Sequence, residues 1–206
     1  MILIHVSYKP INKLLDYTNK QDLTFKPRGL WYSPGKTWIN WSRENLSDRS
    51  NEGLYYYVVV PYYTTIDEPD TDKVLKITNE EDFDEFTFKY GKIVSQNSYQ
   101  TLIIDWKVVA DNYGGIEIIP YLDSRRGIGY GTLNEIIINK YKKNGFNLTK
   151  NSFNLIKDAI VVWYDLFDIA SGCIWNPKSI KKFYQIIKRY KIINGIRTKT
   201  IGIKKN

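Results

Sequence analysis

The chain has 206 residues, of which 43% are hydrophobic and 15% aromatic, enough to bury the core of a single domain. It has no apolar run near the roughly 20 residues that span a bilayer and no recognisable export signal, so we expect a soluble, intracellular protein. Because Cys173 is the only cysteine, an internal disulfide and a cysteine-based zinc site are excluded, which favours a reducing, cytoplasmic compartment.

The first half of the chain is predicted to be rich in strands. Leu54 to Val60 is the clearest, because its aromatic and β-branched residues are bounded by Gly53 and Pro61. Helical spacing of apolar residues predicts helices over 37–45 and 100–111, the second ending at Gly114-Gly115. The other expected strands are Ile2–Val6, Leu30–Ser33, Val74–Ile77, Glu85–Lys89 and Ile116–Tyr121.

The second half is predicted to be helical, with helices near 133–143, 152–167 and 177–190. The last would begin with Asn176 as its cap and Pro177 in the first helical position. We expect a tight turn over 170–176, and a loop over 127–132 that lacks the Gly-Lys-Ser/Thr ending of a phosphate loop. A strand-rich half followed by a helix-rich half on one core predicts an α+β fold in a single domain, residues 1–206.

Three features of the first 121 residues could carry chemistry. His5, the only histidine, lies in the first strand two residues before Ser7, so both side chains point to one face. Gly29 permits close backbone approach and is followed by aromatic residues on a strand. Glu117 sits between apolar neighbours, where an unpaired buried carboxylate would be costly. Each feature alone is also compatible with a purely structural role.

Taken in this order, the three features resemble the ADP-ribosyltransferase superfamily, in the branch with a His, aromatic, Glu triad. His5-Val6-Ser7 matches the first motif, Gly29 to Ser33 followed by a helix matches the second, and Glu117 to Tyr121 matches the third. The resemblance implies a split-sheet transferase core over residues 1–121, with 122–206 as a helical extension that ends in a basic tail.

The resemblance also implies NAD⁺ as the substrate, with loss of nicotinamide and transfer of ADP-ribose, and no metal. His5 and Ser7 would hydrogen-bond the ribose or the nicotinamide amide, and Glu117 would stabilise the developing oxocarbenium charge. Either Trp31, which occupies the family's usual tyrosine position, or Tyr32 would stack on the nicotinamide. The remaining cofactor-binding positions would be Arg28, facing the pyrophosphate, and Gly29 and Ser33 on the same strand.

The acceptor is left open. Arginine-modifying members carry Glu or Gln two residues before the catalytic Glu, whereas this chain has Gly115, which disfavours arginine as the acceptor. A protein, a nucleic acid, a phosphate group and water (NAD⁺ hydrolysis) all remain. Segments 26–33 and 170–176 are also similar to uncharacterised viral and phage proteins, which suggests a virus-infected host cell.

Two non-enzymatic functions are alternatives to the transferase activity. The net charge of +8 is concentrated at one end, since ten basic and no acidic residues follow Asp168. Residues 178–206 could therefore contact the phosphates of a nucleic acid while aromatic side chains stack on bases, although a solubilising surface explains the charge equally well. Alternatively, a degenerate transferase fold could serve protein binding. Cys173 with Asp165 and Asp168 is a weaker candidate for a nucleophile or metal site.

Overall fold

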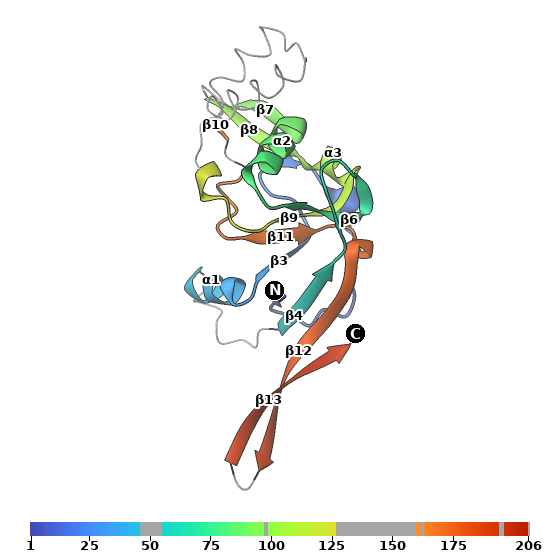
Figure 1. Cartoon of the computed structure of the whole chain (residues 1–206), viewed down its shortest axis with the longest axis vertical. Coiled ribbons are helices and arrows are strands. Elements are labelled where there is room, and N and C mark those ends of the chain that lie inside the picture. Colours follow the sequence, from blue (N-terminus) through green and yellow to red (C-terminus); the bar gives the residue numbers. More distant parts are fainter. Residues whose placement is uncertain (46–54, 97–98, 127–159, 162, 194–195, 206) are drawn as a thin grey trace.

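A computed structural model describes residues 1–45, 55–96, 99–126, 160–161, 163–193 and 196–205 (Figure 1). It is a mixed α/β fold in which strands predominate. Two sheets are seen in these ranges, one large and one small, together with three α-helices and short 3₁₀ turns at Thr18–Lys20, Asp123–Arg125 and Pro177–Ser179. No helix in the described part of the chain is both long enough and apolar enough to cross a membrane.

The large sheet contains nine strands among the described residues, in the order β13-β12-β4-β1-β3-β11-β9-β6-β5. Most neighbours are antiparallel, but β6 is parallel to both β5 and β9. The strands are β1 (Leu3–Ser7), β3 (Leu30–Pro34), β4 (Tyr55–Pro61), β5 (Tyr63–Thr64), β6 (Asp70–Ile77), β9 (Tyr113–Ile118), β11 (Ser171–Ile174), β12 (Ile180–Ile193) and β13 (Ile196–Lys205).

The large sheet curls strongly. Strand β4 lies near one end of the strand order and β5 at the other, yet only Tyr62 separates them in the chain. The Tyr62 backbone secures this closure, because its N–H donates to the Ser179 carbonyl at 2.8 Å and its carbonyl accepts from the Val74 N–H at 2.8 Å. One face of the sheet is therefore turned inward, and it holds a small apolar cluster of Leu3, Tyr32, Val59, Val74 and Ile174.

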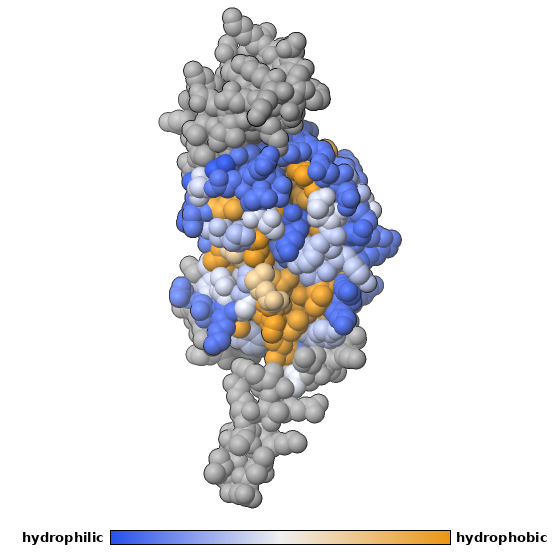
Figure 2. Space-filling model, in the orientation of Figure 1, coloured by the Kyte–Doolittle hydropathy of each residue, from blue (hydrophilic) through white to orange (hydrophobic). Residues whose placement is uncertain are grey.

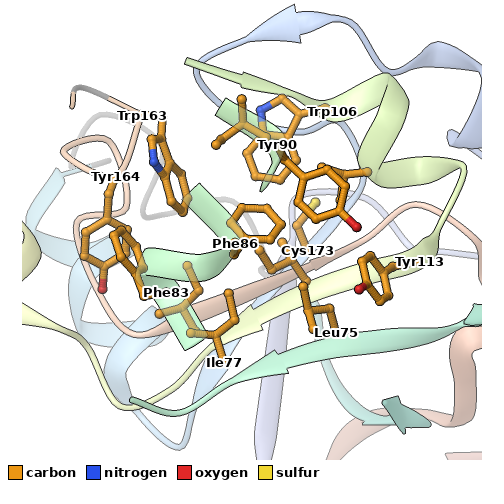
Figure 3. Packing of buried hydrophobic residues seen from close by; sticks show 14 of the residues in the cluster. Leu75, Ile77, Phe83, Phe86, Tyr90, Trp106, Tyr113, Trp163, Tyr164 and Cys173 are labelled. Carbon is orange, nitrogen blue, oxygen red and sulfur yellow. The ribbon is translucent and has the colours of Figure 1, made fainter. Parts of the chain in front are cut away.

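The other face of the large sheet packs on the small sheet and two helices. The small sheet consists of β10 (Ile160–Val161), β8 (Tyr99–Asp105) and β2 (Leu23–Thr24), with β7 (Gly91–Gln96) paired to β8. Helices α2 (Glu80–Tyr90) and α3 (Trp106–Ala110) complete this layer. The main core between the layers is aromatic, with Phe83 stacked on Trp163 at 5.0 Å (Figure 3).

Apolar residues also reach the surface of the large sheet. In the view of Figure 2, hydrophobic side chains gather in the middle of the molecule, over β4 and the start of β12, below a mostly polar upper body. Strand β4 contributes two half-buried valines, Val58 and Val60, whose side chains point away from the inward-facing Val59. This face of the strand is therefore less completely covered than the inner one.

Most of the predicted strands are present. Strands β1, β3, β4, β6 and β9 overlap the expected ones, and α1 (Thr37–Asn45) has the predicted bounds. The strand expected over 85–89 is wrong, because these residues belong to α2. Asn79 caps that helix by accepting from the Asp82 N–H at 2.9 Å, and Phe83, Phe86 and Tyr90 bury one helical face.

The helix predicted over 100–111 is only partly correct. Its first half is strand β8, and α3 starts at Trp106, where the Asp105 side chain accepts from the Val108 N–H and caps the helix. Gly114 and Gly115 do not end the helix but lie inside β9. An added Cβ on Gly114 would collide with the Thr71 carbonyl and the Ser179 side chain, so close packing explains this glycine.

Among the described residues of the second half, strands replace the expected helices. Residues 177–190 form a three-residue 3₁₀ turn followed by β12, although Asn176 does cap that turn by accepting from the Lys178 N–H. The apolar residues of this segment fit both the helical and the strand periodicity, and its pairing with β4 favours the strand. The turn predicted over 170–176 is strand β11. Residues 160–167 contain β10 and a turn, while the expected helix at 133–143, the rest of 152–167 and the loop at 127–132 lie outside the described residues.

Candidate functional site

The cross-strand register places Tyr32 and Glu117 on the same face of the large sheet. Gly172 of β11 is paired with Tyr32 of β3 on one side and with Glu117 of β9 on the other. Residues directly opposite each other in a sheet share a face, so Tyr32, Gly172 and Glu117 form one row on the inward-turned face. Trp31 points to the opposite face, where its ring packs edge-on against Phe167 at 5.1 Å.

Glu117 is a buried carboxylate with only one of its oxygens satisfied. The side chain is on a residue that is 1% exposed, and Oε2 accepts a hydrogen bond from the Tyr63 hydroxyl at 2.6 Å. Oε1 has no hydrogen-bond partner of standard geometry. Burial raises the pKa of Glu117 above its ordinary value, while the Tyr63 and Tyr32 hydroxyls and the charge of Lys76 partly oppose this rise. The raised pKa makes this carboxyl a better proton acceptor than an exposed glutamate.

Tyr32 fills the space that Gly172 leaves open. Its ring is fully buried, and a Cβ on Gly172 would lie 2.8 Å from Tyr32 Cε2 and closer still to Cζ. The hydroxyl of Tyr32 interacts electrostatically with Glu117 but has no hydrogen-bond partner of standard geometry. Burial, first, and the nearby carboxyl raise the pKa of Tyr32. The buried hydroxyl of Tyr32 and the buried carboxyl of Glu117 thus interact with each other without a hydrogen bond of standard geometry.

Tyr63 separates Glu117 from solvent. It belongs to β5, a two-residue strand at the sheet edge, and remains 37% exposed while its hydroxyl reaches the carboxylate. The Nζ of Lys76, the residue paired with Glu117 on β6, lies 4.9 Å from the centre of the Tyr63 ring. Tyr63 thus connects the buried carboxyl of Glu117 to a partly exposed position on a short edge strand.

His5 stands where the large sheet splits. Strands β1 and β3 are paired only at Leu3 with Pro34 and at Ile4 with Ser33, and beyond these pairs β1 bonds to β4 and β3 to β11. At the start of the split, His5 Nδ1 lies 2.6 Å from the Trp31 carbonyl oxygen. A carbonyl can only accept, so Nδ1 carries the proton, and burial lowers the pKa of His5, which keeps the ring neutral. Its Nε2 is then an acceptor.

A hollow opens on each side of this split, and His5 and Gly29 line both. The first, of about 210 Å³, is on the inward-turned side and is bordered by Leu30 and Ile174. The second, of about 320 Å³, lies on the side of Trp31 and falls at the lower end of the range for small-molecule pockets. Neither of these two hollows is lined by Glu117.

The larger hollow is aromatic. Trp31 lines it together with two tryptophans of α1, Trp38 and Trp41, whose rings stack at 5.3 Å. Lys26 stands at its edge, with Nζ 5.4 Å from the centre of the Trp31 ring and 4.0 Å from an Asp168 carboxylate oxygen. Flat aromatic walls with a cation at the rim suit a planar ring that carries negative charge elsewhere in the molecule.

The other predicted site residues have local structural roles. Ser33 is buried and donates to the Ala170 carbonyl at 2.7 Å, and Ser7 donates to the Lys9 carbonyl at 2.7 Å. Arg28 is largely exposed, 3.5 Å from Asp22, and holds Gln21 through its backbone. Gly29 lies against the Ile174 carbonyl, where no Cβ would fit. Of these four, only Gly29 lines the hollows beside His5.

The weaker candidates are not brought together as a site. Cys173 is fully buried, burial raises its pKa, and its Sγ faces the Pro27 carbonyl at 3.8 Å. A thiol in these surroundings is a poor nucleophile. Within the described ranges, no group of three His, Cys, Asp or Glu side chains could hold a metal ion.

Three residues of the candidate site were missed by sequence reasoning: Tyr63, Lys76 and Gly172. Lys76 lies in the predicted strand 74–77 and is paired with Glu117 across the sheet, a contact that no local pattern reveals. Gly172 lies in the segment 170–176, for which the sequence predicts a turn but which contains strand β11. The strand character of that segment was the available signal.

Comparisons with known proteins give no relative: no family model, no curated protein and no solved structure matches this chain.

Proposed function

We propose that this protein is a NAD⁺-dependent ADP-ribosyltransferase-like enzyme with Glu117 as its central catalytic residue. The observation that carries the proposal is the row on the inward face, in which Tyr32, Gly172 and Glu117 are neighbours and Oε1 of the acid lacks a partner. His5 lies on the same face, because it is two residues from Leu3 on β1 and residues two apart on a strand share a face. Leu3 belongs to the inward cluster with Tyr32.

The split between β1 and β3 is where we place the dinucleotide. The split has a neutral His5 on one side, Gly29 on the other and a hollow on each face of the sheet. A split sheet is also the architecture that the resemblance to ADP-ribosyltransferases implies. The Nε2 of His5 accepts a hydrogen bond from a ribose hydroxyl. A planar ring of the dinucleotide stacks on Trp31 in the larger hollow, because Trp31 has space beside it and Tyr32 has none.

Glu117 acts on the reacting ribose. Its free Oε1 accepts a hydrogen bond from a ribose hydroxyl, and the carboxylate stabilises the positive charge that develops at the anomeric carbon. The bond from this carbon to the nicotinamide nitrogen breaks, and the electron pair leaves with neutral nicotinamide. The acceptor then bonds to the carbon and gives its proton to Glu117, whose raised pKa favours uptake. The Tyr63 side chain moves aside to admit the ribose.

The test measures nicotinamide release from labelled NAD⁺ in the presence of mixed protein, nucleic-acid and water acceptors. We expect the wild type to release nicotinamide and Glu117→Gln to lose at least about 100-fold in rate, in line with removal of a transition-state contact. Glu68→Gln, an exposed acid directly before Pro69, is the matched control and should keep full activity.

A binding measurement makes the test independent of the unknown acceptor. Titration calorimetry with NAD⁺ should give similar affinity for the wild type and Glu117→Gln, and weaker affinity for His5→Ala and Trp31→Ala. If the wild type neither binds NAD⁺ nor releases nicotinamide with any acceptor, the proposal is wrong. Release that persists unchanged in Glu117→Gln would remove Glu117 from the mechanism.

A further inference from the structure

The positive charge of this protein resides in its C-terminal segment. Of its 30 Lys and Arg residues, ten follow Asp168, while all 22 acidic residues lie at or before it. The first 168 residues therefore carry 20 basic against 22 acidic side chains and are close to neutral. The excess positive charge therefore lies on β12, β13 and the 3₁₀ turn before them.

These strands form a ribbon that leaves the body of the protein. Strand β12 is paired with β4 only from Ile180 to Gln185. From Ile186 to Ile193 its described partner is β13 alone, and the two strands project together beyond the sheet (Figure 1). Eight residues of strand span about 26 Å. We call the residues 186–193 and 196–203 the basic ribbon.

Burial in the body does not explain the basic ribbon. A two-stranded hairpin is only marginally stable by itself in water, because neither of its faces is covered. Lysines at strand edges also oppose pairing with a second copy. A ribbon of this length with five basic residues and no acid is therefore best explained by a partner that supplies negative charge on both of its sides. The five are Lys188, Arg189, Lys191, Arg197 and Lys199.

The register places basic positions on both faces of the ribbon. Lys188 is paired with Ile201 and Tyr190 with Lys199, on one face, whereas Arg189 with Thr200 and Lys191 with Thr198 occupy the other. A ribbon lying on a membrane would segregate its basic and apolar positions onto opposite faces. Basic residues also lie on both strands, Lys188, Arg189 and Lys191 on β12 and Arg197 and Lys199 on β13. This matches a groove, in which each strand runs beside one wall of phosphates.

We propose that the basic ribbon binds double-stranded DNA in its major groove. This groove is about 12 Å wide and admits a two-stranded β-ribbon, whereas the major groove of duplex RNA is too narrow for protein side chains. Duplex DNA carries one charge per about 1.7 Å of its axis, so the ribbon spans enough phosphates for all five basic residues. The inference is independent of the NAD⁺ chemistry, and Glu117→Gln should bind DNA like the wild type.

The experiment measures fluorescence anisotropy of a labelled 20-base-pair duplex with the full chain at several salt concentrations. The ribbon variant replaces the five basic residues by Gln. Its control replaces five exposed lysines of the body by Gln, which removes the same charge. These control positions are Lys9, Lys20, Lys36, Lys89 and Lys107.

We expect the ribbon variant to lose at least tenfold in affinity and the slope of log K against log salt to flatten by about 0.9 for each phosphate contact removed. The body control should keep the wild-type slope. Equal losses of DNA affinity in both variants would mean non-specific attraction. Tight binding to phosphatidylserine vesicles without binding to DNA would identify a membrane surface as the partner. Either result overturns the proposal, and so does wild-type DNA affinity in the ribbon variant.

The unfolding temperature of each variant shows whether it is folded. Because the ribbon projects from the body, its substitution should leave this temperature unchanged. If the fivefold variant does not fold, Arg189→Gln with Lys191→Gln replaces it, with an expected flattening of the slope by about 2.

Discussion

Glu117→Gln should make the protein more stable at neutral pH. Burial raises the pKa of Glu117, so the folded state binds a proton more tightly than the unfolded chain does. The free energy of unfolding then falls as the pH rises from the unfolded-state pKa, about 4.3, through the raised folded-state pKa. Glutamine has nearly the same shape and no charge, and its amide can donate to the buried Tyr32 hydroxyl, which is unsatisfied.

The size of the effect follows from the unsatisfied oxygen. A buried group without a partner costs about 1–3 kcal/mol, and for a chain of this length 1 kcal/mol shifts the Tm by about 2–4 °C. We therefore expect Glu117→Gln to raise the Tm by at least about 3 °C at pH near 7.5, with the gain vanishing below about pH 4. The Tyr63 hydrogen bond is retained, because the glutamine oxygen accepts it.

Thermal unfolding followed by circular dichroism from pH 4 to pH 8 checks this expectation, with the exposed Glu68→Gln as control. The informative quantity is the difference in Tm between variant and wild type as a function of pH. A wild type more stable than Glu117→Gln at pH 7.5, or a difference that does not change with pH, would refute the reasoning, because the carboxylate would then be fully solvated or paired by its surroundings.

Three further substitutions and reactions test the packing around the site. Gly172→Ala should destabilise the protein by about 1–3 kcal/mol in urea unfolding, because its Cβ collides with Tyr32, and Tyr32→Leu in the same chain should recover part of the loss. Asp84→Asn should cost about 1–3 kcal/mol, since the amide nitrogen cannot accept one of the two 2.7 Å bonds from Arg125 and the charge of the carboxylate is lost. Asp70→Asn on the exposed pair with Lys73 should change nothing measurable. Cys173 should react with a thiol reagent only after unfolding, and fast labelling of the native protein would contradict its burial.

The sequence was sufficient to place the strands that carry the candidate residues but not to place their neighbours. His5, Tyr32 and Glu117 lie on β1, β3 and β9, which overlap the strands predicted over 2–6, 30–33 and 116–121. The segment 180–193 combines Ile, Tyr and Lys in an order that suits either a helix or a strand, and pairing with β4 decides between them. Such long-range pairing leaves no local signal, which is why Lys76 and Tyr63 were missed. Gly172 was missed because strand β11 was interpreted as a turn.

The resemblance covers residues 1–121, but the site that we propose needs strand β11 from the C-terminal part. Strand β11 lies between β3 and β9 and is hydrogen-bonded to both, so it joins the strand of Tyr32 to the strand of Glu117. Ser33 adds a bond to Ala170 directly before it. Without β11, the central strands β3 and β9 would become edges. Removal of the whole C-terminal part would also take Trp163 and Phe167 out of the core.

A chain that ends at residue 126 should therefore not fold cooperatively, although it contains every residue of the three motifs. Circular dichroism should show a broad, non-cooperative thermal transition, and NAD⁺ should not bind. Adding residues 160–185 as a separate peptide should not restore binding unless β11 inserts between its two neighbours. A truncated chain with a sharp unfolding transition would show instead that β3 and β9 can pair directly and that β11 is an addition to a self-sufficient core.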